Sequence, residues 1–212
     1  MGNQSASRTH RKAAPRTPRS AEAKQRQRDL LRIATDTFAD RGYNNASLQE
    51  IADRAGLTQA GVLHYFRTKA QLLTSVLELR DASDIDRFGT ERPRGLAFLR
   101  HLVDTVARNA EREGIVRLYA VLSAESVTEG HPAQEYFRTR YEGLRASIVE
   151  ALQEACELGE IQDRRSVEDT ANAIIAVMDG LQVQWLLSPD RVDMADSTDR
   201  AITALLAGLA PS

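Results

Sequence analysis

The sequence predicts an all-α protein, with an N-terminal three-helix domain and a larger helical body. Apolar residues recur at helical spacing along most of the 212 residues, and no alternating run of useful length predicts a strand. Glycines and prolines divide the periodic stretches into segments of helical length. We expect a disordered basic arm over 1–20, the three-helix domain over 21–68 and the body over 69–212.

Charge is distributed unevenly along the chain. The net charge is −2, yet residues 1–80 hold 14 lysines and arginines against 7 aspartates and glutamates. The basic N-terminal part, called the head below, precedes an acidic body. This distribution indicates that only the head meets a polyanion. Residues 1–20 carry five basic side chains, no acid and few large apolar groups, which predicts disorder. This arm either lies along nucleic-acid phosphates or is a solvated leader without a role.

The composition, 42% hydrophobic and 27% charged, is that of a soluble globular protein. No stretch approaches the roughly 18 uncharged apolar residues of a membrane helix, and no apolar segment follows the first charges as in a secretory signal. We therefore expect a cytoplasmic protein that has no membrane partner. Cys156 is the only cysteine, which excludes an internal disulfide and paired-cysteine metal sites.

The first helix is expected over 21–41. Leu31, Ala34 and Phe38 share one face of it, and Gly42 follows as a natural C′ residue.

Two short helices and a longer one come next. Residues 47–50, Ser-Leu-Gln-Glu, match a capping box, in which the serine and the glutamate each satisfy a backbone N–H. This helix ends at Gly56, and Thr58 caps a third helix that runs to about Tyr65. A further cap signal at residues 68–71 opens a longer helix, which is expected near 70–87. The helices after it are expected near 94–112, 115–128, 132–158, 166–187 and 193–209.

Residues 47–66 match the helix-turn-helix plan of DNA-binding proteins, because two short helices flank a tight glycine turn. Leu57, Val62 and Phe66 would anchor the second helix to the core, so its opposite face is free to enter a major groove. On that face Gln59 can hydrogen-bond a base, adenine by preference. The outward residues are Gln59, Ala60, Gly61 and Leu63, with His64 and Tyr65 near the end.

The sequence around this motif resembles the N-terminal domain of the tetracycline-repressor (TetR) family. The resemblance covers roughly the first 80 residues, and the rest of the chain matches in length and helical plan. The residues that carry it are Leu31, Ala34, Phe38, Gly42, Tyr43, Ser47, Ile51, Ala52, Ala55, Gly56, Leu57, Tyr65, Phe66, Lys69 and Leu73.

The resemblance implies that Thr58 to Tyr65 is the helix that reads DNA, with Gln59, Ala60, Gly61 and Leu63 facing bases. It places Tyr65 and Lys69 on phosphates, aided by Leu48 and Gln49 at the start of the preceding helix. Lys69 begins a helix, where its charge and the exposed N–H groups both suit an anion. Many relatives carry tyrosine at Leu63, so here a leucine either touches a thymine methyl or faces solvent.

A domain of this size reads too few base pairs alone, which predicts a homodimer on a palindromic double-stranded operator. The last two helices are the natural interface, and the resemblance implies that they pair with their copies in a four-helix bundle. Alternatively they only close the core of one protomer. The interface candidates are Ala171, Ile174, Ile175, Leu181, Ile202, Leu205, Leu206 and Leu209.

The apolar and aromatic residues of the body helices predict a cavity between these helices. The resemblance implies that it binds a small-molecule effector, which shifts the population of states that bind DNA. Taken one by one, such residues are more often plain core than ligand contacts. The candidates are Phe98, His101, Leu102, Val106, Arg117, Tyr119, Leu122, Phe137, Tyr141, Met178 and Trp185.

An enzyme and a protein-binding adaptor are the alternatives. Glu125, Glu129, Glu135 and His131 suggest a helical metal site, but the paired Glu-x-x-His pattern of such sites is missing. No nucleophile elbow, P-loop or zinc-protease motif occurs, so we expect no catalysis, no metal and no cofactor. The basic head argues against the adaptor. Repression rather than activation is the family's default and is not shown by these residues.

Overall fold

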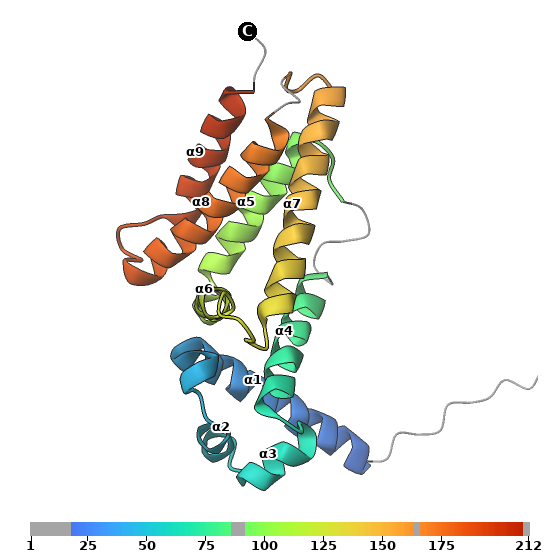
Figure 1. Cartoon of the computed structure of the whole chain (residues 1–212), viewed down its shortest axis with the longest axis vertical. Coiled ribbons are helices and arrows are strands. Elements are labelled where there is room, and N and C mark those ends of the chain that lie inside the picture. Colours follow the sequence, from blue (N-terminus) through green and yellow to red (C-terminus); the bar gives the residue numbers. More distant parts are fainter. Residues whose placement is uncertain (1–17, 86–91, 163–165, 210–212) are drawn as a thin grey trace, which may run out of the picture.

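The computed structural model describes residues 18–85, 92–162 and 166–209, so most of the predicted arm, 1–17, lies outside the described residues. Nine helices and no strand make up these ranges, which confirms the all-α class. No helix within them combines the length and the hydropathy that a bilayer crossing requires. The helices are α1 (Pro18–Asn45), α2 (Leu48–Arg54), α3 (Gln59–Tyr65), α4 (Lys69–Ile85), α5 (Leu96–Ala110), α6 (Glu113–Glu125), α7 (Gln134–Glu157), α8 (Val167–Leu187) and α9 (Met194–Ala207) (Figure 1).

Helix α1 differs from the prediction at both ends. It begins at Pro18, inside the segment expected to be disordered, because proline is tolerated in a first turn that does not need its N–H. At its other end α1 continues past Gly42 to Asn45 with a kink. Gly42 has φ 71° and ψ 177°, which glycine adopts readily and other residues do not. The predicted glycine turn is present, but it bends the helix instead of ending it.

The predicted capping residues form their hydrogen bonds. Ser47, Thr58 and Thr68 each accept the backbone N–H three residues ahead, at 3.0, 3.1 and 3.0 Å. The carboxylate of Glu50, expected to complete the box at Ser47, instead lies 3.4 Å from Arg41 Nε. From α4 onward every helix end lies within three residues of its predicted position, because these caps and breaks are local signals.

The buried side chains form two clusters. The first joins α1–α4 to α6 and the start of α7, with Leu118 and Leu122 of α6 fully buried in it. The second joins α5, α7, α8 and α9. Figure 1 shows α6 end-on between the head helices and the upper bundle. The head therefore packs against the body through α6.

Candidate DNA interface and ligand cavity

Helix α3 presents one face to solvent at the end of the molecule remote from α9 (Figure 1). The predicted anchors Val62 and Phe66 are buried, at 0% and 2% exposure, which fixes the rotation of the helix. Leu63 is 36% exposed, a large share for an apolar side chain. The other predicted contacts that lie exposed here are Thr58, Gln59, Ala60 and His64.

Four predicted contacts are less accessible or already engaged. Leu48 and Tyr65 are half-buried and pack against the head core, and Gly61 is half-buried as well. Gln49 is exposed, and its amide donates to Asp53 at 2.7 Å. The predicted DNA contacts that are exposed and unengaged thus lie mainly on α3.

Lys69 is turned toward the end of α1. Its Nζ lies 4.3 Å over the Tyr43 ring and 3.5 Å from the carbonyl oxygen of Asn44. Burial lowers the pKa of Lys69, and the negative charge of Glu125 opposes that shift. For this ammonium to hold a phosphate, as predicted, it has to leave the tyrosine ring.

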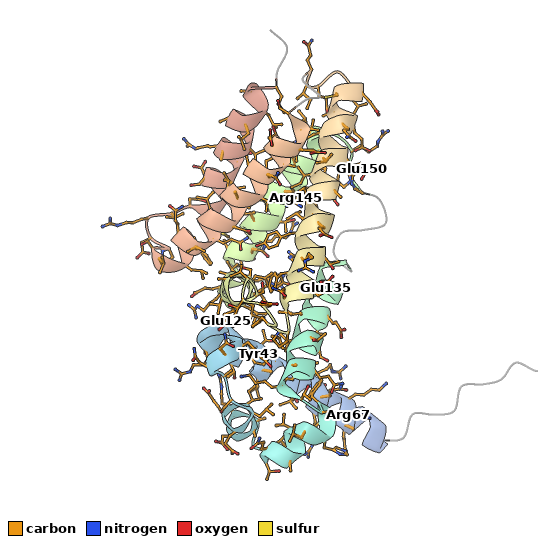
Figure 2. All side chains as sticks on the ribbon, viewed as in Figure 1. Tyr43, Arg67, Glu125, Glu135, Arg145 and Glu150 are labelled. Atoms are coloured by element: carbon orange, nitrogen blue, oxygen red, sulfur yellow. The ribbon has the colours of Figure 1, made fainter. Side chains whose placement is uncertain are left out.

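Sequence reasoning missed Arg67, which lies in the turn between α3 and α4. Its side chain is exposed, and in the described ranges it has no acidic partner, whereas the head arginines Arg41 and Arg54 pair with Glu50 and Asp40. Figure 2 shows it at the α3 end of the molecule. The signal was available in the sequence, because Arg67 is the first arginine or lysine after the predicted reading helix.

Glu125, the last residue of α6, joins the body to the head. Its carboxylate accepts the backbone N–H groups of Tyr43, at 2.6 Å, and Asn44, at 3.4 Å. Figure 2 shows Glu125 and Tyr43 side by side where α6 meets α1. A Cβ at Gly42 would lie 2.3 Å from the carboxylate, so this contact needs glycine for space as well as for conformation. The buried His131 places Nε2 3.7 Å from the carboxylate, and burial lowers the pKa of His131.

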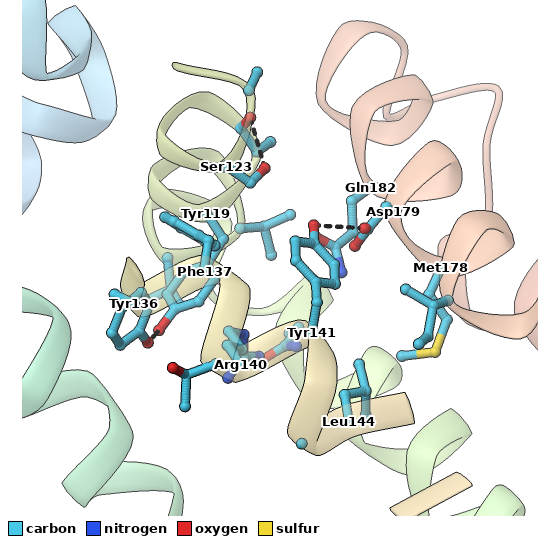
Figure 3. Close-up of a pocket in the computed structure, with 18 of the residues that line it drawn as sticks. Tyr119, Ser123, Tyr136, Phe137, Arg140, Tyr141, Leu144, Met178, Asp179 and Gln182 are labelled. Carbon is cyan, nitrogen blue, oxygen red and sulfur yellow. Dashed lines mark hydrogen bonds between the residues drawn. The ribbon is translucent and has the colours of Figure 1, made fainter. Parts of the chain in front are cut away.

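A cavity of about 900 Å³ lies between α5, α6, α7 and α8 (Figure 3). That volume is within the range of small-molecule sites. Five predicted pocket residues line it: Leu102, Tyr119, Phe137, Tyr141 and Met178.

The other predicted pocket residues lie outside the cavity lining. Leu122 and Val106 are buried core. Arg117 pairs with Asp40 at 3.5 Å and with Glu113. Phe98 packs against the second core cluster beneath the guanidinium of Arg92, at 4.8 Å. His101 and Trp185 are half-buried on α5 and α8. These six residues are not part of the lining of this cavity, so a ligand contact by any of them stays a prediction.

The cavity also holds Asp179 and Tyr136, which sequence reasoning missed and which hydrogen-bond to the predicted tyrosines. The hydroxyl of Tyr141 donates to Asp179 Oδ2 at 2.7 Å. Burial first, and then the bond to Asp179, raises the pKa of Tyr141 to about 12, and burial raises the pKa of Asp179. The hydroxyls of Tyr119 and Tyr136 hydrogen-bond to each other. Asp179 could have been found, because it is the only charged residue between positions 170 and 187.

The predicted dimer residues divide into two groups. Ala171, Ile174, Ile175, Ile202 and Leu209 are buried in the protomer's own second cluster, so their side chains are covered without a second copy. Leu181, Leu205 and Leu206 are half-buried. The large apolar side chains left exposed on α8 are Val183, at 46%, and Leu187, at 78%.

Comparison with known proteins finds matches to both parts of the chain. The family model described as bacterial regulatory proteins, tetR family, matches residues 30–76. The model described as BetI-type transcriptional repressor, C-terminal, matches residues 95–211, which is more than half of the chain.

One relative is the HTH-type transcriptional regulator TtgR of Pseudomonas putida, 25% identical over 191 residues that cover 84% of this chain and 89% of TtgR. Two solved structures share the fold. A transcriptional regulator from Saccharomonospora viridis in complex with choline has a TM-score of 0.74 and 18% identity, over 91% of this chain and 100% of the other. The complex of SmeT, from Stenotrophomonas maltophilia, with triclosan has a TM-score of 0.70 and 18% identity, over 89% and 93% of the two chains.

Proposed function

This chain belongs to the TetR family of bacterial regulatory proteins, and on that premise we propose that it is a cytoplasmic repressor that binds a palindromic operator as a homodimer and leaves it when a small molecule fills the cavity. The observation that carries the proposal is the arrangement of one helix, α6. Its side chains line the cavity, and its last residue, Glu125, holds the turn of α1 in the head.

DNA binding is assigned to the exposed face of α3. Val62 and Phe66 hold the helix by its buried side, which leaves Gln59 and Leu63 directed away from the core. A helix presented in this way fits a major groove, where Gln59 can bond a base edge. Arg67, at the end of α3, supplies a positive charge for a backbone phosphate.

Dimerisation is assigned to the outward faces of α8 and α9. Because most of the apolar residues on these helices are used inside the protomer, the interface would be carried by Leu187 together with half-buried Leu181, Leu205 and Leu206. Figure 1 shows both helices along one side of the upper bundle. A dimer through this side presents two copies of α3, as two half-sites require.

The signal from the cavity passes through α6. A ligand that fits the cavity better in one position of α6 favours that position by its difference in affinity. Since Glu125 bonds the backbone of Tyr43, a displacement of α6 moves the end of α1, against which the head helices pack. Coupling of this kind is typically worth about 1–3 kcal/mol, which changes operator affinity roughly 5- to 150-fold. In the related structures the ligands are choline and triclosan, which are unlike each other chemically.

Selection of genomic DNA fragments by the purified protein tests the proposal. The expected result is a set of fragments that share an inverted repeat, with affinity that falls steeply between about 50 and 200 mM salt. Gln59→Ala is expected to weaken binding to the selected site, and Gln153→Ala, at an exposed glutamine on α7, is the matched control. Absence of an enriched repeat, or a flat salt response, would refute DNA binding and favour a protein-binding adaptor.

A further inference from the structure

We propose that the cavity binds a lipophilic cation, with the Asp179 carboxylate as its counter-charge and the surrounding aromatic rings as its wall. That the bound cation acts as the effector rests on the proposed function, whereas its binding rests on the cavity alone.

The Asp179 carboxylate is the centre of the site. It lies at the cavity on a stretch of α8 that is otherwise uncharged, and it accepts one hydrogen bond, from Tyr141. Over the described ranges, no lysine, arginine or histidine forms an ion pair with it. Figure 3 shows Arg140, the cation that influences Asp179 at longer range, on the other side of the Tyr141 ring. A carboxylate in an apolar surrounding is costly unless a positive charge meets it, and a bound cation supplies that charge.

Aromatic rings form the wall next to this carboxylate. Tyr119, Tyr136, Phe137 and Tyr141 all line the cavity. Ring faces attract cations, most strongly where water is excluded. The guanidinium of Arg140 already lies 4.7 Å over the Tyr119 ring, so one ring of this wall holds a positive charge in the resting protein. Glu135, the second carboxylate in the lining, already pairs with Arg138 at 2.8 Å. The combination of the Asp179 carboxylate with several tyrosines therefore favours a cation that carries apolar groups.

The size and the remaining lining agree with such a ligand. A volume of about 900 Å³ holds a drug-sized molecule. Apolar side chains such as Leu102, Leu144 and Met178 provide contacts for its hydrocarbon part. A small hydrophilic cation would leave these surfaces uncovered, whereas a lipophilic one removes them from water.

Two ions of the same shape and opposite charge test the proposal. Binding of tetraphenylphosphonium and of tetraphenylborate to the full-length protein without DNA is measured by titration calorimetry. Tetraphenylphosphonium is expected to bind, and tetraphenylborate is expected to bind more weakly. The proposal is wrong if the phosphonium does not bind, or if the borate binds as tightly, which would make Arg140 the dominant charge.

Variants then assign the charge. Asp179→Asn keeps the size of the side chain and an acceptor for Tyr141, and it is expected to weaken phosphonium binding by about tenfold or more, without weakening the borate. Asp179→Glu keeps the charge and is expected to retain most of the affinity. Asp169→Asn, an exposed aspartate on the same helix, is the matched control. Equal phosphonium affinity in the wild type and Asp179→Asn overturns the assignment, and unchanged borate binding shows that the variant's cavity is folded.

Release of operator DNA separates this inference from the proposed function. If the phosphonium binds through Asp179 and the DNA stays bound, the cation site stands and the effector role of the cavity fails. If the phosphonium releases DNA equally well from Asp179→Asn, the carboxylate is not its counter-charge and the inference fails.

Discussion

Gly42 and Glu125 offer the sharpest test of how the head is attached to the body. In Gly42→Ala the new Cβ would lie 2.3 Å from Oε1 of Glu125, and the backbone would keep φ 71° and ψ 177°. The variant therefore meets two separate penalties. One is conformational, and the other is the expulsion of the carboxylate from the N–H groups of Tyr43 and Asn44.

The two penalties are of similar magnitude. A non-glycine residue in this backbone region costs about 1–3 kcal/mol. Loss of hydrogen bonds to a charged acceptor, here one part-buried and one exposed N–H group, costs about 1.5–3 kcal/mol. Gly42→Ala is thus expected to lower the free energy of unfolding by about 2.5–6 kcal/mol, a large part of the about 5–15 kcal/mol typical of a domain. Glu125→Ala alone removes only the second contribution.

A double-mutant cycle measured by urea unfolding, at one fixed protein concentration, separates them. In the Glu125→Ala background the carboxylate is gone, so Gly42→Ala costs only the backbone contribution. The double variant is expected to be more stable than the sum of the single effects by about 1.5–3 kcal/mol. Additive effects within about 0.5 kcal/mol would refute the contact between these residues.

Three further predictions follow from the charges and the exposed side chains. Hydrogen bonds from Arg94 and Gly95 lower the pKa of Glu154 from 4.5 to about 2, so its ionised form stabilises the fold above pH 4.5 and this contribution is lost as the pH falls toward 2. Unfolding midpoints of Glu154→Gln and the wild type are therefore expected to differ at neutral pH and to converge in acid. Arg67→Ala is expected to weaken binding to all DNA sequences alike and to reduce the slope of log affinity against log salt by about 1, and a changed sequence preference would contradict a phosphate contact. Leu187→Glu is expected to shift sedimentation toward the protomer, while Leu158→Glu, at another exposed leucine, leaves the assembly unchanged.

The sequence by itself was enough to predict the helices and the motif. Ser47, Thr58 and Thr68 bond to groups three residues away, and apolar spacing sets which face of each helix is buried, so these signals do not depend on the rest of the fold. The exposed face of α3 follows in the same way, because Val62 and Phe66 mark its buried side.

The tertiary structure alone decided which residues meet across the chain. Tyr43 and Glu125 are 82 positions apart, and Tyr141 and Asp179 are 38 apart, yet each pair is hydrogen-bonded. Leu122 and Tyr119 lie on the same helix and look alike as apolar residues, but only Tyr119 lines the cavity. The physical reason is that periodicity gives the apolar face of a helix, whereas the rotation and crossing of packed helices determine what that face touches.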